Sequence, residues 1–137
     1  MAFTVKQVSY YYVAVHDLPG EAYKMLSQLA GLGINLVAFS AVPIGPNTTQ
    51  LALFPEDESR LRTEAQRAGI DVDGPHHALM VQGDDELGSL AQIHEKLFQA
   101  NVDVYAATGV ADGRGSFGYI IYIRPEQLEA AMEAVGL

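Results

Sequence analysis

VHDLPGEAYKMLSQLAGLGINLVAFSAV (residues 15–42) and GDDELGSLAQIHEKLFQANVDVYAATGV (residues 83–110) share one pattern when Asp17 is aligned with Asp85. Each pattern predicts a strand end with an acid, a three-residue step to glycine, a helix, a second strand and a glycine-rich turn. The same shift aligns identical residues, which are Val13/Val81, Asp17/Asp85, Gly20/Gly88, Leu29/Leu97, Ala38/Ala106, Val42/Val110 and Gly45/Gly113. The sequence therefore predicts one unit that occurs twice.

Each repeat is predicted to hold five elements in the order βαββα. In the first repeat these are strand 8–15, a helix that ends at 31–33, strands 34–42 and 49–54, and a helix between 55 and 69. In the second they are strand 77–82, helix 87–100, strands 102–110 and 119–124, and a helix from 125 onward. We place the units at residues 1–74 and 75–137, which leaves the second unit without a last strand of its own.

The predicted fold class is α+β, with helices on one face of antiparallel sheet. Each predicted helix has a single apolar stripe, so each needs one sheet face to cover. With 137 residues and 49% hydrophobic content, the chain is large enough for an ordinary buried core.

Charge and composition exclude several classes of function. The net charge is −9, with 8 basic against 17 acidic residues, which opposes binding to nucleic acid. The absence of cysteine removes disulfides, thiolate nucleophiles and thiolate metal sites. No apolar run reaches the length of a transmembrane helix, and the N-terminus lacks the features of a signal peptide, so we expect no membrane contact and a cytoplasmic location.

Two motifs carry a resemblance to a known family. The run Asp17-Leu18-Pro19-Gly20 and the helix end Gly31–Asn35, in a βαββαβ order, resemble the ACT domain, a ferredoxin-like module that binds small molecules. The tandem arrangement resembles small stand-alone proteins of two ACT domains. This resemblance implies a regulatory protein with an amino-acid ligand near a domain interface and a possible partner enzyme. The second repeat departs from the motif, with Leu87 in place of proline and Asp103 in place of Asn35.

The stretch from Asp17 to Ala22 suggests a binding loop. If Pro19 is the first helical residue, the backbone N–H groups of Gly20, Glu21 and Ala22 lack intrahelical partners and form an anion site that suits a carboxylate. Asp17 could receive an ammonium group, and Leu18 completes the loop, so the two poles match a free amino acid. On this view Gly20→Val would abolish binding and leave the fold intact. The alternative is a helix start that binds nothing.

Two further sets of residues complete the candidate site. Asp85, Gly88 and Ser89 could repeat the binding loop in the second repeat, with the Ser89 hydroxyl as an extra donor. The acids Asp84, Asp85 and Glu86 would repel an anion, so we rank this loop below the first. The resemblance implies that Asn35 contacts a ligand from a neighbouring domain, whereas a turn residue that satisfies its own backbone is the alternative.

No residue pattern indicates catalysis, a metal or a cofactor. His76 and His77 are adjacent, which places them on opposite faces of a strand and makes them a poor metal pair. His94 takes the place of Leu26 in the repeat, so we expect a partly packed helix histidine. Residues 112–118 are glycine-rich but join two strands, as in a hairpin turn rather than a phosphate loop. We therefore predict a protein that is not an enzyme.

Two functions are compatible with this sequence. The protein is either an amino-acid sensor that acts on a partner enzyme, or an assembly or regulatory-subunit module whose loops bind nothing and whose sheet edges pair. We also expect at least a homodimer, because a second unit without its fourth strand would leave backbone groups unpaired.

Overall fold

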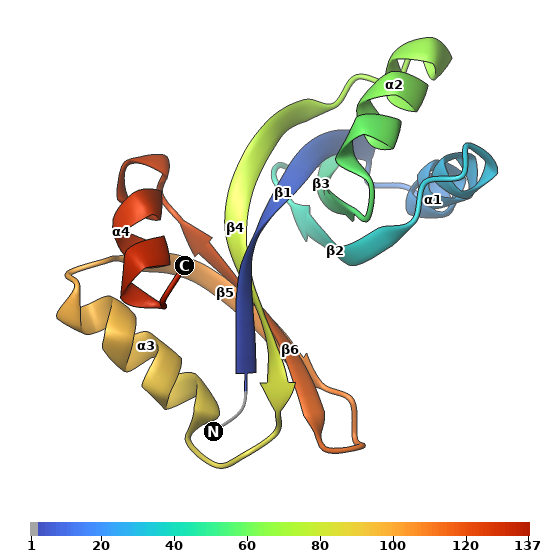
Figure 1. The fold of residues 1–137 in the computed structure, drawn as a ribbon. Helices are drawn as coiled ribbons and strands as arrows, with labels where there is room; N and C mark the ends of the chain where they lie inside the picture. The colour runs from blue at the N-terminus through green and yellow to red at the C-terminus, as the bar shows by residue number, and fades with distance from the viewer. Residues whose placement is uncertain (1–2) are drawn as a thin grey trace. The chain divides into compact units, whose positions relative to one another are not determined.

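The computed structural model describes residues 3–137, which form six strands and four α-helices. Figure 1 shows their arrangement within each part of the chain. A short 3₁₀ turn, η1, precedes the last helix. The elements, in chain order, are β1 (Phe3–His16), α1 (Glu21–Gly31), β2 (Leu36–Pro43), β3 (Thr48–Pro55), α2 (Glu58–Ala68), β4 (Asp73–Asp84), α3 (Ser89–Gln99), β5 (Val104–Ala111), β6 (Ser116–Ile123), η1 (Pro125–Gln127) and α4 (Leu128–Ala134).

The repeat that aligns Asp17 with Asp85 holds in the structure element by element. The bounds of α1 and α3, of β2 and β5, and of β3 and β6 all differ by this same shift. The turns repeat as well, because Ile44 N donates to Thr48 O at 3.0 Å and Asp112 N donates to Ser116 O at 2.9 Å. The last helix differs, since α4 is shorter than α2 and begins after η1.

Contacts divide the chain into two compact units. The first unit is Ser9–His76, and the second joins residues 3–8 to His77–Leu137. The change between units at His76 lies close to the expected boundary after residue 74. Residues 3–8, which the sequence places with the first repeat, lie with the second unit instead.

In the first unit, α1 and α2 cover one face of the sheet. The strand order is β2-β3-β1-β4, and β3 pairs antiparallel with both β1 and β2, with Leu53 opposite Tyr11 and Phe39. Leu29 of α1 and Leu61 of α2 join one buried cluster with strand residues on alternating positions; its buried members are Tyr11, Val13, Leu29, Ile34, Leu51, Leu53 and Leu61. The expectation of helices on one face of antiparallel sheet is confirmed.

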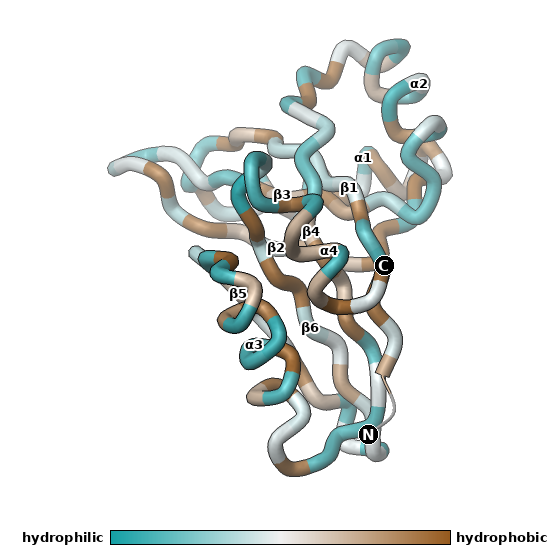
Figure 2. The backbone as a smooth tube through the Cα atoms, turned by 60° about the vertical axis from the view of Figure 1, so that its left-hand side comes forward, coloured by the Kyte–Doolittle hydropathy of each residue, from teal (hydrophilic) through white to brown (hydrophobic). Residues whose placement is uncertain are grey.

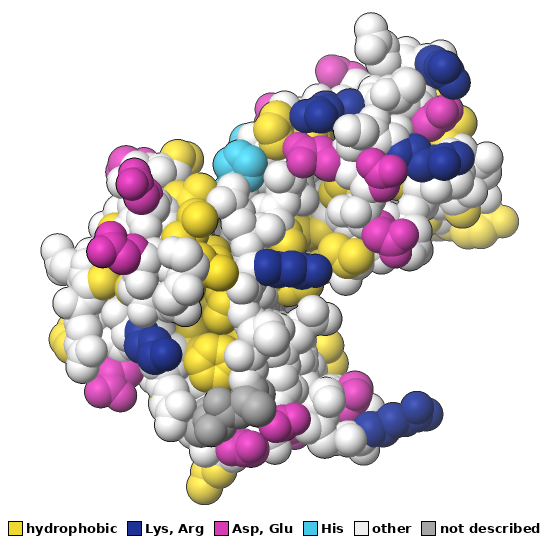
Figure 3. Space-filling view, in the orientation of Figure 1, with side chains coloured by type: hydrophobic (Ala, Val, Ile, Leu, Met, Phe, Trp, Pro, Cys, Tyr) yellow, Lys and Arg dark blue, Asp and Glu magenta, His cyan; other side chains and the backbone are white. Residues whose placement is uncertain are grey.

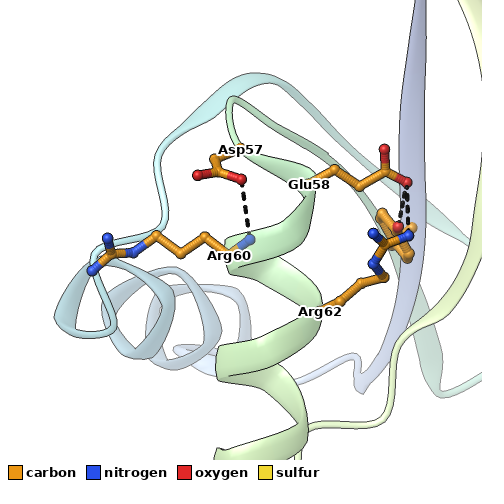
Figure 4. A network of polar contacts seen from close by, with 5 residues as sticks. Asp57, Glu58, Arg60 and Arg62 are labelled. Carbon is orange, nitrogen blue, oxygen red and sulfur yellow. Dashed lines mark hydrogen bonds and ion pairs between the residues drawn. The ribbon is translucent and has the colours of Figure 1, made fainter.

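Local signals place the ends of the helices. Asp57 caps α2, because its side chain accepts a hydrogen bond from Arg60 N at 3.1 Å (Figure 4), and Gly69 ends the helix in the left-handed conformation. The Arg60 side chain reaches from α2 to the end of α1, where its Nε donates to Leu32 O at 3.4 Å. A cation at the carbonyl end of a helix is favourable for the helix dipole.

The second unit repeats this design with a strand from the N-terminus. Its order is β1-β4-β6-β5, and β6 pairs antiparallel with β4 and β5. Hydrophobic and hydrophilic segments alternate along α3 (Figure 2), whose Ile93 and Leu97 are buried in the core of this unit. The other buried residues of this core are Leu79, Val81, Val102, Tyr119, Ile121, Ile123 and Ala131.

The fourth strand of the second unit is the beginning of β1. Phe3 and Val5 pack against the second core, and Thr4 Oγ1 donates to Gln82 O of β4 at 3.3 Å. Residues 75–137 thus lack a last strand of their own, as expected. The inference that β4 is therefore an open edge is wrong, because β1 lies beside it. The edge of β4 therefore gives no support for a dimer, and the dimer stays a prediction.

Candidate functional site

The loop between β1 and α1 brings together most of the residues predicted to bind a ligand. β1 ends at His16 and α1 begins at Glu21, so Asp17, Leu18, Pro19 and Gly20 form an exposed loop. Asp17 N donates to Asn47 O at 2.9 Å, which ties the loop to the β2–β3 turn. Ala22 lies in the first turn of α1 and packs partly against the first core.

The helix start differs from the sequence prediction in two respects. Pro19 is not the first helical residue, because Gly20 is the N-cap, with φ +88° in the left-handed region. The Glu21 amide is not free either, since it donates to Leu18 O at 3.3 Å. A β-branched residue is strained at such a φ, so the premise that Gly20 lies in the first helical turn and tolerates a side chain there is wrong.

Asn35 lies away from this loop within the first unit. Asn35 directly precedes Leu36 of β2, which pairs with Pro55 at the end of β3. Asp17 directly follows His16 of β1, which pairs with Thr48 at the start of β3. The length of β3 therefore separates them by roughly 20 Å. The Asn35 amide donates to Glu56 Oε2 at 3.0 Å. The structure does not bring Asn35 and the loop into one site of this unit.

The loop between β4 and α3 repeats the same hydrogen bonds in the second unit. Asp85 N donates to Gly115 O at 2.9 Å, and Gly88 is the N-cap of α3 with φ +87°. Ser89 is buried, and its hydroxyl donates to Glu86 O at 2.9 Å. The expectation that Ser89 offers this hydroxyl to a ligand is wrong, because the hydrogen is used within the loop.

A pocket of about 660 Å³ opens beside this second loop. It is lined by three segments of the second unit, which are Asp85–Ala91, Gly109–Ala111 and Phe117–Tyr119. The backbone N–H groups of Leu90 and Ala91 in the first turn of α3 have no acceptor among the described residues. The pocket is large enough for a free amino acid.

One wall of the pocket is a tyrosine that packs on a glycine. Tyr119 of β6 lies opposite Gly109 of β5, and a Cβ on Gly109 would come within 2.6 Å of the Tyr119 ring. The Tyr119 hydroxyl is hydrogen-bonded to His94 Nε2 of α3 at 2.5 Å. Burial raises the pKa of Tyr119 above its usual value. This side of the pocket is thus a close-packed wall with one polar pair.

The charge around the pocket is negative. Asp85 and Glu86 line it, Asp84 precedes them, and none of the lining residues is a lysine or arginine. Elsewhere, acidic side chains are spread over the face drawn in Figure 3 rather than gathered in one patch. The loop favours an ammonium group, while the free amides of α3 favour a carboxylate. A zwitterion satisfies both.

Tyr119 and Gly109 are among the pocket-lining residues that were not predicted from the sequence to bind. His94, which contacts Tyr119, was expected only as a partly packed helix histidine. The alignment of the two repeats contained a signal, because these positions correspond to Leu51, Ala41 and Leu26 in the first repeat. At all three positions the residue of the second repeat differs from the residue of the first repeat. His94 is half-buried, as expected.

The helices and the polar side chains of residues 3–137 bear on two other classes of site. None of their helices has both the length and the apolar character that a membrane crossing requires. No group of three or more histidine or acidic side chains among them could hold a metal ion.

Comparisons with known proteins give likenesses in structure. None of the known protein-family models matches the sequence, and no curated protein sequence matches it. The crystal structure of protein BT0572 from Bacteroides thetaiotaomicron is similar with a TM-score of 0.76 at 16% identity, over 97% of this chain and 88% of that one.

Regulatory subunits of aspartate kinase are also similar. The ligand-free subunit from Thermus thermophilus has a TM-score of 0.60 at 17% identity, over 97% of this chain and 93% of that one. The subunit from Thermus flavus has a TM-score of 0.56 at 17% identity, over 98% and 93%. At such identities the likeness concerns the fold. Together with the repeated βαββ pattern, it shows that this chain has the tandem ACT-type fold that its motifs predicted.

Proposed function

We propose that this protein is a non-catalytic regulatory module of the ACT type whose ligand is a free amino acid. The observation that carries the proposal is the pocket beside Asp85–Ala91, where an acidic loop and free helix amides lie together. A carboxylate would accept hydrogen bonds from Leu90 N and Ala91 N. The ammonium group would lie toward Asp85 and Glu86. A partner enzyme is part of the proposal, because two proteins of similar fold are regulatory subunits of a kinase.

The second unit is the preferred site for a geometric reason. The position of Ala91 in α3 corresponds to Tyr23 in α1. Ala91 therefore leaves the first turn of the helix more open in the second unit than the Tyr23 ring does in the first. The loop from Asp17 to Ala22 stays the second candidate, because it repeats the same backbone hydrogen bonds with fewer acids.

Filling the pocket should abolish ligand binding without unfolding the protein. We expect at least one of the twenty amino acids to raise the melting temperature of the unmodified protein. Ala91→Tyr copies the first repeat, where Tyr23 is 74% exposed, so the helix accepts the ring. Loss of one or two charge-assisted hydrogen bonds should weaken binding at least tenfold. Thermal shift and calorimetry would measure both quantities.

The reverse substitution is the matched control. Tyr23→Ala removes the ring from the first unit and should leave binding unchanged if the ligand lies in the second unit. A loss of binding with Tyr23→Ala but not with Ala91→Tyr would move the site to the first loop. If no amino acid raises the melting temperature, the ligand proposal fails.

The second candidate function is assembly through the sheet edges. β2 and β5 are the outer strands of their units, they are mostly exposed, and neither contains a charged residue. Exposed edges usually carry charges that prevent pairing, so we expect a homodimer or larger homo-oligomer in solution. Mass measurement at micromolar concentration tests this expectation, and a monomer would contradict it. Thr108→Lys, in the middle of β5, should shift the mass toward monomer if this edge pairs.

A further inference from the structure

The Tyr119–His94 pair is a polar contact inside an otherwise apolar wall. Tyr119 is 9% exposed, lines the pocket and belongs to the second core with Ile93 and Leu97. Its hydroxyl contacts His94 Nε2, and the two ring centroids are 5.7 Å apart. The pair thus connects β6 to α3 directly beside the pocket.

The fold does not need a polar pair at these positions. In the first repeat the corresponding residues are Leu26 and Leu51, and Leu51 is fully buried in a core of the same design. Polar groups cost free energy when they leave water, and one hydrogen bond recovers that cost only in part. Leucine would serve packing at lower cost, so the pair points to a role in the pocket.

The pair leaves one hydrogen-bonding position of the Tyr119 hydroxyl open. If Tyr119 donates to His94, its oxygen can still accept a hydrogen bond. If His94 donates to Tyr119, the hydroxyl hydrogen is free to be donated. In both tautomers His94 holds the hydroxyl of this pocket-lining side chain, and the remaining position suits a group that can both donate and accept.

We propose that Tyr119, positioned by His94, selects the side chain of the bound amino acid, and that the ligand carries a neutral hydroxyl or carboxamide. This inference rests on the proposed function, because it assumes an amino acid in the second pocket. Hydroxyl and carboxamide groups can both donate and accept, as the open position requires. An anionic side chain is disfavoured by Asp84, Asp85 and Glu86, and an apolar one would leave the open hydrogen-bonding position of the hydroxyl unused.

The test compares amino acids of similar shape that differ in hydrogen bonding. Threonine against valine and glutamine against methionine are two such pairs, measured by calorimetry on the full chain. We expect the polar member of one pair to bind about tenfold more tightly than the apolar member. In Tyr119→Phe the ratio should fall to near one, because the polar member loses affinity while the apolar member keeps it.

Two control variants separate selection from structural damage. Tyr122→Phe removes a hydroxyl from the same strand, outside the pocket lining, and should leave the ratio unchanged. His94→Leu introduces the residue of the first repeat and should reduce the ratio, since the Tyr119 hydroxyl is no longer held. Melting temperatures of all variants report whether the fold persists.

The outcomes distinguish this inference from the proposed function. Equal binding of polar and apolar members by the unmodified protein would overturn the inference and leave the amino-acid proposal standing. A ratio that persists in Tyr119→Phe would do the same. If no amino acid binds at all, both proposals fall. A ratio that is lost in Tyr119→Phe and kept in Tyr122→Phe supports the inference, because general destabilisation would change both members equally.

Discussion

Deletion of residues 1–8 should unfold the second unit. A compact unit of this size has a free energy of unfolding of roughly 4 to 10 kcal/mol. Phe3 and Val5 are half-buried against the second core, and side chains of this kind contribute about 1.5 to 3 kcal/mol when fully buried. The strand also pairs with β4, at about 0.5 to 1.5 kcal/mol for each hydrogen bond. The loss is comparable to the whole stability of the unit.

Hydrogen exchange would measure this effect locally. Amides of β4 from His77 to Asp84 and of β6 should exchange much faster in the shortened protein, and the β4 edge should promote aggregation. The matched control is Lys6→Ala, which changes an exposed side chain of the same strand and should cost less than about 1 kcal/mol. Exchange in β4 at the unmodified rate after deletion would contradict the prediction.

The sequence predicted the repeat and most element bounds, because both depend on local periodicity. Strand 49–54 and the helix end at 31–33 lie close to the observed bounds of β3 and α1. The predicted strand 8–15 missed the first half of β1. Lys6 and Gln7 break its apolar pattern, and the contact of Thr4 with Gln82 joins distant parts of the chain, about which periodicity gives no information.

The candidate site was predicted in part, for a similar reason. The two strand–helix loops are local features, so Asp17 and Asp85 were located from their spacing to glycine. The conformation of Gly20 was not predicted, because Pro-Gly fits both the first turn of a helix and a turn that precedes the helix. The pocket wall joins α3, β5 and β6, and its recognition requires the register that sets Gly109 opposite Tyr119.

One part-buried polar contact in the first unit joins a core tyrosine to a carboxylate of α2. Tyr11 is 1% exposed, and its hydroxyl donates to Glu58 Oε1 at 2.6 Å. Arg62 Nη1 lies 3.6 Å from the same oxygen and stays paired with Glu58 on the surface of α2 (Figure 4). Burial, together with the hydrogen bond to Glu58 and its charge, raises the pKa of Tyr11 to about 12. The ordinary pKa of tyrosine is about 10.

The first unit should therefore lose stability between pH 10 and pH 12. In this range the unfolded chain has released the Tyr11 proton while the folded chain still holds it, so the free energy of unfolding falls as pH rises. A difference of about two pKa units corresponds to about 2 to 3 kcal/mol, which is fully present below pH 10. Denaturant titrations at pH 8, 10 and 12 would measure the fall.

Tyr11→Phe should remove this part of the pH dependence and lower stability at pH 8. The variant keeps the ring in the core but loses a hydrogen bond to a carboxylate, at about 1.5 to 3 kcal/mol. Glu58 keeps Arg62 as its partner, so no buried charge is left alone. Tyr23→Phe is the control, because its side chain is 74% exposed and its loss should stay within about 0.5 kcal/mol. A Tyr11→Phe protein that loses as much stability from pH 10 to 12 as the unmodified one would show that other groups cause the fall.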